Sequence, residues 1–356
     1  MNETRTNRKI ESLEGIRAIA FISILLSHTA ALVPGRWGVS VFLLLSGFLM
    51  TYSYWNREIP AKLDAAASFS VKKIKKLYII HVIMIFVGLY YSLKFFDPSI
   101  KDLFWTTPIT IILFQTWTPY SYQALNSVAW YLSVTLFLYF AFPFVLAFLK
   151  RHSKKTISII LLGIVAWFVQ IVIGFLISHV PQLDYRWFYY CFPPYRLFDF
   201  IIGCCLGALF VKTKNITRTS FMTWTIIELM MVLAICLNIC YFKSMPSKIA
   251  QDWYTWANMF LPVNVFGIYI FACGKGFISK LISQKIFGFI GKISSYAFLI
   301  HIHVMHFSQI ALDKMMDEMN PIYYKFLVTL IVLLITILLS YTYMRLSALI
   351  SKWRKD

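Results

Sequence analysis

The chain has 356 residues, of which 59% are hydrophobic and 14% charged, and it carries a net charge of +19 at neutral pH. A soluble domain of this size could not hide so much apolar surface, so the composition predicts an all-α integral membrane protein. The lysines and arginines lie in short clusters between apolar stretches, as in cytoplasmic loops. Membrane topology therefore explains the charge better than nucleic-acid binding, and we expect no nucleic-acid partner.

Apolar stretches of membrane-spanning length recur along the whole chain and predict ten transmembrane helices. The expected spans are 15–32, 38–55, 77–95, 128–149, 156–177, 196–211, 221–241, 256–273, 286–310 and 323–350. The stretch 103–117 is also apolar, but it is short and proline interrupts it at Pro108, with Pro119 just beyond. We expect it to form a re-entrant or interfacial segment on the outer side.

Ten spans with the N-terminus inside place most lysines and arginines in cytoplasmic segments, in agreement with the positive-inside rule. This arrangement predicts a single membrane domain, with a helical bundle over 13–350 and cytoplasmic tails over 1–12 and 351–356. The first apolar stretch follows a polar start and is long enough to stay in the bilayer, so we expect no cleavable signal peptide. The expected location is a cell membrane, which the chain crosses many times.

Two ionisable residues within the first predicted span, Arg17 and His28, are the strongest indication of function. Such groups at membrane depth are costly and normally face a protein interior or a water-filled cavity. Eleven residues of α-helix return to within about 20° of the same face and rise roughly 16 Å. One helix face therefore carries a cation near the cytoplasmic surface and a titratable imidazole near the middle of the bilayer. We expect both to face one solvated chamber that holds a long anionic ligand.

The N-terminal region contains sequence motifs of a known family. Residues 13–20 read LEGIRAIA, and residues 35–49 read GRWGVSVFLLLSGFL. With ten residues between Arg17 and His28, this region resembles acyltransferase family 3. Members of that family carry an L-(D/E)-G-(L/I)-R start, the same arginine-to-histidine separation, and a second helix of the form G-V-x-x-F-F-x-L-S-G-F. Weaker similarities follow in the family's order at 130–143, at 196–203 (RLFDFIIG) and at 293–301 (ISSYAFLIH).

Two positions depart from the family pattern. Thr135 stands where many members have glutamate. The arginine pair that many members place after the second helix is replaced by Lys73-Ile74-Lys75-Lys76, which keeps the charge but loses bidentate phosphate geometry. Both departures suggest a divergent branch, so the acceptor should not be copied from a typical member.

The resemblance implies an O-acyltransferase that moves acetyl, or a similar short acyl group, from cytoplasmic acyl-coenzyme A. The implied acceptor is a hydroxyl of an envelope or exported carbohydrate, and a small lipophilic or macrolide-like acceptor stays open. Acyl-coenzyme A, most simply acetyl-coenzyme A, would be a donor substrate, and we expect no permanently bound cofactor. Acyl transfer needs a base, stabilisation of an oxyanion and a grip on the donor.

His28 is the expected base or acyl relay, because an imidazole titrates near neutral pH. The alternative for His28 is an interhelical hydrogen bond. Arg17 is expected to act in catalysis and to bind the donor pyrophosphate, unless it only extends to the interface. The outlying donor phosphate is assigned to the lysine cluster, which otherwise serves as a topology signal or contacts anionic lipid; its members are Lys72, Lys73, Lys75 and Lys76.

His301 matches the family's histidine and is expected to face the cavity as a second acid, base or hydrogen-bond partner. His303 should point to another side of the same helix, and His306 should lie nearer the outer surface. This spacing argues against a metal site. Arg196 and Asp199 are expected either to line the acceptor mouth or to form an intrahelical salt bridge. Ser46 and Gly47 are expected to allow close helix packing rather than to supply a nucleophile.

Two other classes of function remain open. A transporter or flippase would use Arg17 and His28 to bind an anionic or glycan solute or to relay protons. The chain shows no internal repeat, which weighs against that class. A scaffold or sensor that kept the fold without activity would account for Thr135.

Overall fold

The computed structural model describes residues 9–96, 98–214, 220–246, 252–313 and 320–353. These residues form helices and no strand, and nine of the helices are long and apolar enough to cross a membrane. They are α2 (Gly35–Tyr54), α3 (Leu63–Phe95), α5 (Trp130–His152), α6 (Thr156–Ile177), α7 (Pro193–Thr213), α8 (Phe221–Ser244), the joined pair α10 (Trp253–Ala257) and α11 (Leu261–Cys273), α13 (Lys285–Asp313) and α14 (Pro321–Trp353). The predicted all-α, multi-pass membrane fold is confirmed.

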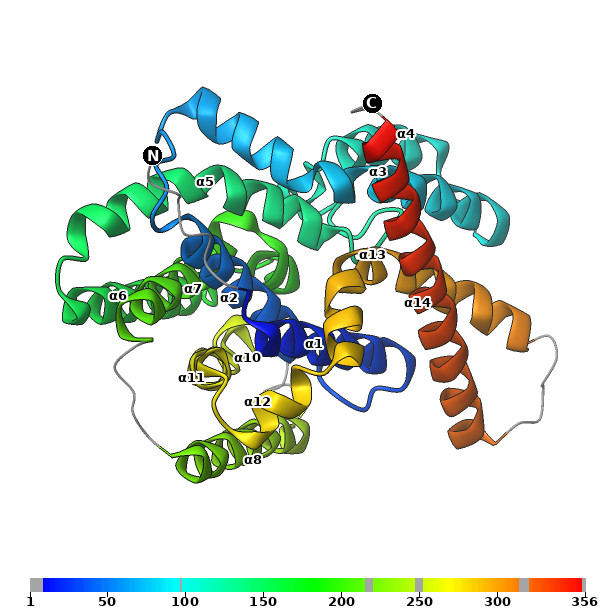
Figure 1. The fold of residues 1–356 in the computed structure, drawn as a ribbon. Coiled ribbons are helices and arrows are strands. Elements are labelled where there is room, and N and C mark those ends of the chain that lie inside the picture. The colour runs from blue at the N-terminus through cyan, green and yellow to red at the C-terminus, as the bar shows by residue number, and fades with distance from the viewer. Residues whose placement is uncertain (1–8, 97, 215–219, 247–251, 314–319, 354–356) are drawn as a thin grey trace.

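The first predicted span forms a helix, α1 (Glu11–Thr29), but it is not among those nine. Its 19 residues measure roughly 28 Å, close to the thickness of the hydrocarbon core. The polar residues Glu14, Arg17 and His28 lower its mean hydropathy. Figure 1 shows α1 near the centre of the bundle, where it packs against α2 and α13. Its ionisable groups are tolerated at this depth because its neighbours are protein.

The centre of the bundle is a close contact between α2 and α7. A Cβ atom added at Gly47 would lie 2.2 Å from the Phe200 carbonyl oxygen, and one added at Gly203 would lie 2.2 Å from that of Leu44. Any larger side chain would push these backbones apart, so glycine at both positions permits the contact. The predicted packing role of Gly47 is confirmed, whereas Ser46 lines a cavity and donates its hydroxyl to the Phe42 carbonyl oxygen of its own helix.

Burial separates central from peripheral helices. The most apolar stretch of α2 is 78% buried and that of α7 is 67% buried, whereas the values are 11% for α8 and 17% for α14. Figure 1 shows α14, drawn in red, along the outer side of α13, and α8 at the edge of the bundle. Exposed apolar faces are expected on helices that contact lipid tails.

The segment after α2 differs most from the predicted boundaries. We expected a span from residue 77, but α3 begins at Leu63, so the lysine cluster lies on a helix rather than in a loop. The α4 helix (Ile100–Ile111) has 12 residues, about 18 Å, which is too short to cross a bilayer. The prediction that 103–117 is not a full span is confirmed; a 3₁₀ turn, η1 (Gln115–Trp117), ends it.

Two short elements were not predicted. A π-helical turn, η2 (Trp187–Cys191), precedes α7, and α12 (Phe277–Ile282) precedes α13. The first is wound too loosely, and the second is too short, to give a periodic apolar pattern. Of the predicted tails, residues 1–8 and 354–356 lie outside the described residues, and Glu11 already belongs to α1.

Candidate active site

A cavity of about 200 Å³, named here the Arg17 cavity, lies between α1, α2, α3, α5 and α13. The side chains of Arg17, Ser46, Lys73, Tyr131 and Thr135 are among those that line it. Its described lining residues include two cations and no carboxylate. Such a cavity can receive an anionic ligand.

Hydrogen bonds from α13 hold the Arg17 guanidinium in place. Arg17 Nη2 donates to the Ser295 hydroxyl at 2.8 Å and to the Ser294 hydroxyl at 3.4 Å. Glu14, one turn earlier, lies 3.9 Å from Arg17 Nη1. The side chain is 23% exposed, so Arg17 is not simply extended to the protein surface. A guanidinium has five N–H donors, and these contacts leave donors for a ligand in the cavity.

Of the four predicted donor-binding lysines, Lys73 is the one that lines the Arg17 cavity. Its ammonium group lies 4.5 Å from the Tyr54 ring centroid and 5.4 Å from that of Phe69. All four lysines are exposed, but Lys72, Lys75 and Lys76 do not line this cavity. Successive helical residues are rotated by about 100°, so one helix cannot turn all four lysines toward one cavity.

A second cavity of about 310 Å³, named here the His28 cavity, lies beyond the C-terminal half of α1. Its lining includes His28 from α1, Arg36 from α2, and the aromatic side chains of Trp130, Tyr190 and Trp256. Arg186 and Gln123 also line it. His28 is exposed to this space. Burial raises the pKa of the Tyr190 phenol, which therefore stays neutral at physiological pH and offers a hydroxyl group.

His301 lies directly behind His28. The two ring centroids are 5.3 Å apart and the ring planes are tilted by 59°. His301 is fully buried, so the expectation that it faces the cavity is wrong, although its proximity to His28 is found. His301 Nδ1 lies 2.8 Å from the Phe298 carbonyl oxygen. Because a carbonyl only accepts, Nδ1 carries the proton and Nε2 keeps its lone pair.

Three aromatic rings, named here the aromatic partition, separate the two cavities. Phe42 and Tyr131 have ring centroids 6.1 Å apart, and Phe298 lies 6.3 Å from Phe42 and 5.3 Å from Tyr131. Phe298 lines both cavities. The single chamber that we expected is therefore divided in two, because aromatic residues of α2, α5 and α13 meet between Arg17 and His28.

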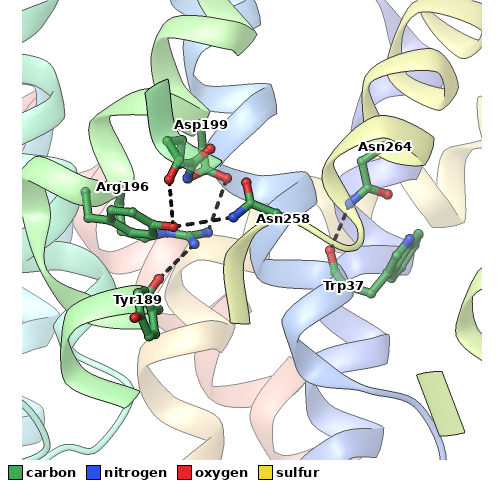
Figure 2. Close-up of polar contacts among 8 residues, drawn as sticks. Trp37, Tyr189, Arg196, Asp199, Asn258 and Asn264 are labelled. Atoms are coloured by element: carbon green, nitrogen blue, oxygen red, sulfur yellow. Dashed lines mark hydrogen bonds and ion pairs between the residues drawn. The ribbon is translucent and has the colours of Figure 1, made fainter. Parts of the chain in front are cut away.

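Arg196 and Asp199 line neither of these cavities. Their side chains are 1% and 0% exposed, and Arg196 Nη2 lies 3.4 Å from Asp199 Oδ1. Figure 2 shows the pair in a buried polar network with Tyr189 and Asn258. Arg196 Nη1 donates to the Tyr189 carbonyl oxygen at 3.2 Å, and Gln170 donates to Asp199 Oδ2 at 2.9 Å. Of the two alternatives, the structure shows the intrahelical salt bridge, and the acceptor-mouth placement is wrong.

Three other ionisable residues of the predicted spans contact neighbouring segments. His303 faces Gly88 of α3, on a different side of α13 from His301, as expected. His306 stacks on Tyr91 at 4.9 Å between centroids. Among the described residues, no group of three or more His, Cys, Asp or Glu side chains could hold a metal ion. Glu228 accepts hydrogen bonds from the backbone of Gly276 and Ser279.

Comparison with known proteins agrees with the motifs. The family model described as an acyltransferase domain, that of acyltransferase family 3, matches residues 10–344. The chain belongs to acyltransferase family 3. No solved structure matches this chain.

Individual members of acyltransferase family 3 are distant in sequence. The chain is 24% identical to the acyltransferase MdmB of Streptomyces mycarofaciens over 234 residues, which cover 58% of each protein. It is 26% identical to the peptidoglycan O-acetyltransferase OatA of Listeria monocytogenes over 57% of this chain and 35% of OatA. A Staphylococcus aureus protein, named provisionally as an O-acetyltransferase, is 24% identical over 90% of this chain and 54% of its own length. The chain thus spans between about a third and three fifths of these relatives.

The structure places one family departure directly at the site. Thr135, where many members of acyltransferase family 3 have glutamate, lines the Arg17 cavity and donates its hydroxyl to the Tyr131 carbonyl oxygen at 2.7 Å. A carboxylate there would share the cavity with Arg17. In this chain the position is neutral, which leaves the cavity more positive.

Sequence reasoning missed the residues that build the His28 cavity beyond α1. Arg36, Arg186 and Trp256 come from three separate segments, and no periodic pattern joins them. Arg36 lies two residues before Gly38, where the second motif of acyltransferase family 3 begins, so the resemblance gave it no role. Phe298 and Tyr131 lie within similarities to the family, yet aromatic residues are so frequent in this chain that they gave no separate signal.

Proposed function

We propose that the chain is a membrane O-acyltransferase that transfers acetyl, or another short acyl group, from acyl-coenzyme A to a hydroxyl of an envelope or exported carbohydrate. One observation carries the proposal: Arg17 and His28 lie on one helix and line adjoining cavities that share Phe298. The cation in the Arg17 cavity and the imidazole in the His28 cavity provide one site for each substrate of a two-substrate enzyme.

The Arg17 cavity binds the donor in this proposal. The Arg17 guanidinium contacts the pyrophosphate, and Lys73 contacts an outlying phosphate. The positive-inside rule places this end of α1 at the cytoplasm, where acyl-coenzyme A is made. The cavity is smaller than the whole donor, so the nucleotide lies at its mouth. The pantetheine arm passes between the rings of the aromatic partition and brings the thioester to the His28 side.

The His28 cavity binds the acceptor. His28 accepts the proton of the acceptor hydroxyl as its oxygen attacks the thioester carbonyl carbon. The tetrahedral intermediate collapses with cleavage of the carbon–sulfur bond, and the leaving coenzyme A thiolate takes up the proton that His28 accepted. His301, with its proton fixed on Nδ1, positions the His28 ring and does not itself touch a substrate.

A transient acyl-imidazole on His28 is the alternative route for the same transfer. Rapid-quench experiments with labelled acetyl-coenzyme A and no acceptor separate the two routes. A burst of protein-bound label that equals the enzyme concentration supports the covalent route. Absence of bound label, with turnover that starts only when acceptor is added, supports direct transfer.

The test uses purified full-length protein in nanodiscs with acetyl-coenzyme A labelled in the acetyl group. We expect thioester cleavage, and transfer to an added glycan, that His28→Ala reduces by at least about a hundredfold, the lower range for loss of a general base. His152→Ala is the matched control, because His152 is exposed and bonds only to the Phe148 carbonyl oxygen of its own helix among the described residues. Solute counterflow without thioester cleavage would instead establish a transporter.

A further inference from the structure

The His28 cavity has a feature that base catalysis does not require: two arginines and a row of aromatic rings on the wall beyond His28. Arg36 and Arg186 both approach the ring of Trp256, with guanidinium carbons 3.3 Å and 5.9 Å from its centroid. The described lining of this cavity includes no aspartate or glutamate. Positive charge is therefore concentrated in the part of the lining that holds Trp256.

The aromatic side chains form a continuous row. The Tyr190 ring centroid lies 4.6 Å from that of Trp130 and 5.3 Å from that of Trp256. Flat rings give apolar faces on which the C–H face of a sugar can pack, and the Tyr190 hydroxyl gives a polar edge beside them. Gln123, Ser127 and Ser27 add neutral hydrogen-bonding groups to the same lining.

The position of Arg36 is fixed by the fold. Arg36 is the second residue of α2, and Pro34 and Gly35 beside it also line the cavity. Its Nη1 donates to the Thr255 hydroxyl at 3.3 Å, and its guanidinium stacks on Trp256. The partial positive charge of the α2 N-terminus adds to that of the side chain. Arg186 precedes η2 and is exposed, so it stands at the mouth of the cavity.

We propose that the His28 cavity selects an anionic saccharide, one that carries a carboxylate or phosphate close to the hydroxyl that receives the acyl group. This inference rests on the proposed function. Arg36 and Arg186 bind the anionic group, since the guanidinium fork matches carboxylate and phosphate oxygens. The row Trp130, Tyr190 and Trp256 packs against the sugar, and the hydroxyl points back toward His28.

Binding measured by calorimetry tests the inference without any need for turnover. The probes are p-nitrophenyl β-D-glucuronide and p-nitrophenyl β-D-glucoside, which differ in the carboxylate, and p-nitrophenyl β-D-glucoside 6-phosphate. Full-length protein in phosphatidylcholine nanodiscs should bind each anionic probe about tenfold more tightly than the glucoside, the factor that one charge-assisted hydrogen bond gives. The preference should weaken as salt rises, because Arg186 is exposed.

Variants of Arg186 decide the outcome, since an exposed side chain can change without unfolding the protein. Arg186→Gln should remove most of the preference, Arg186→Lys should keep part of it, and Arg186→Glu should favour the neutral probe. Lys101→Gln, an exposed cation on α4, is the matched control and should keep the wild-type preference. Equal binding of neutral and anionic probes, or a preference that survives Arg186→Glu, would overturn the inference.

Two further results separate saccharide binding from lipid binding and from the proposed acyl transfer. If phosphatidylglycerol nanodiscs abolish glucuronide binding, the arginines bind a lipid headgroup and the saccharide assignment is overturned. If anionic probes bind as expected but acetyl-coenzyme A is never cleaved, the acceptor site stands while the proposed acyl transfer fails.

Discussion

His28 and His301 lie with ring centroids 5.3 Å apart, one exposed to a cavity and the other fully buried behind it. The buried ring is fixed by the Phe298 carbonyl oxygen, and Phe298 in turn lines both cavities. One turn of α13 therefore sets the environment of His28 and the boundary between donor and acceptor.

The His301 contact predicts a positioning effect. His301→Phe fills the same space without a ring nitrogen, and we expect kcat for acetyl transfer to fall by about tenfold or more while the KM for acetyl-coenzyme A changes little, as for loss of an outer partner of a reactive group. If His301→Phe shifts the pH–rate profile and His301→Gln shifts it less, His301 acts through His28. An unchanged kcat in His301→Phe would contradict it.

Lys73 and Lys75 provide a matched pair for donor binding. Lys73 lines the Arg17 cavity and Lys75 does not, so Lys73→Gln should raise the KM for acetyl-coenzyme A more than Lys75→Gln does. The expected increase is about tenfold, the effect of losing one ionic contact to phosphate. Steady-state kinetics on both variants checks this. Equal increases in KM would show that the donor phosphate contacts the lysine cluster as a whole rather than Lys73.

Arg17 itself should depend on geometry as well as charge. Arg17→Lys keeps the positive charge but loses the planar guanidinium, which can donate to the Ser295 hydroxyl and to a ligand in the cavity at the same time. We expect a higher KM for acetyl-coenzyme A in Arg17→Lys and a larger increase in Arg17→Gln. Dephospho-coenzyme A, used as a competitor, should lose affinity in the same order. Equal KM values for acetyl-coenzyme A in wild type and Arg17→Gln would show that Arg17 does not bind the donor.

The aromatic partition predicts how tightly thioester cleavage is coupled to acetyl transfer. Phe298→Ala should join the two cavities and admit water, so thioester hydrolysis should rise relative to transfer. Phe298→Leu keeps more of the side-chain volume than Phe298→Ala does, so its ratio of hydrolysis to transfer should lie between those of wild type and Phe298→Ala. The measurement is the ratio of free acetate to acetylated glycan, and a ratio that stays constant across the series would show that Phe298 does not separate the substrates.

The buried pair Arg196–Asp199 predicts a loss of stability rather than of binding. Asp199→Asn leaves the Arg196 charge buried and uncompensated, which costs about 3 kcal/mol in comparable sites. The melting temperature should fall, whereas the KM values for donor and acceptor should not change. An increase in the acceptor KM alone, at an unchanged melting temperature, would show that Arg196 and Asp199 take part in acceptor binding.

The sequence predicted most of the fold and half of the candidate site. Helical periodicity places Arg17 and His28 on one face of α1, and each lines a cavity, but these are two cavities rather than the one chamber that was expected. Periodicity failed at Lys72, Lys73, Lys75 and Lys76 because the cluster was assigned to a loop. Once α3 begins at Leu63, a rotation of about 100° per residue turns Lys75 away from the cavity that Lys73 lines.

The rest of the site depends on contacts between distant segments. Arg36 meets Trp256, and His28 meets His301, although the two members of each pair lie far apart in the sequence. Neither contact has a local signal, because both depend on how the helices pack. Arg196 and Asp199 were ambiguous for the same reason: their i, i+3 spacing fits an intrahelical pair and a cavity wall equally, and burial decides between them.

Sealed proteoliposomes of defined orientation keep the donor and the acceptor on opposite sides of the membrane. Labelled acetyl-coenzyme A is supplied on the side of the Arg17 cavity alone, and a glycan acceptor is enclosed on the side of the His28 cavity. We expect label on the enclosed glycan, and its loss in His28→Ala but not in His152→Ala. Transfer that persists in His28→Ala, or that occurs only when donor and acceptor share one side, would contradict this expectation.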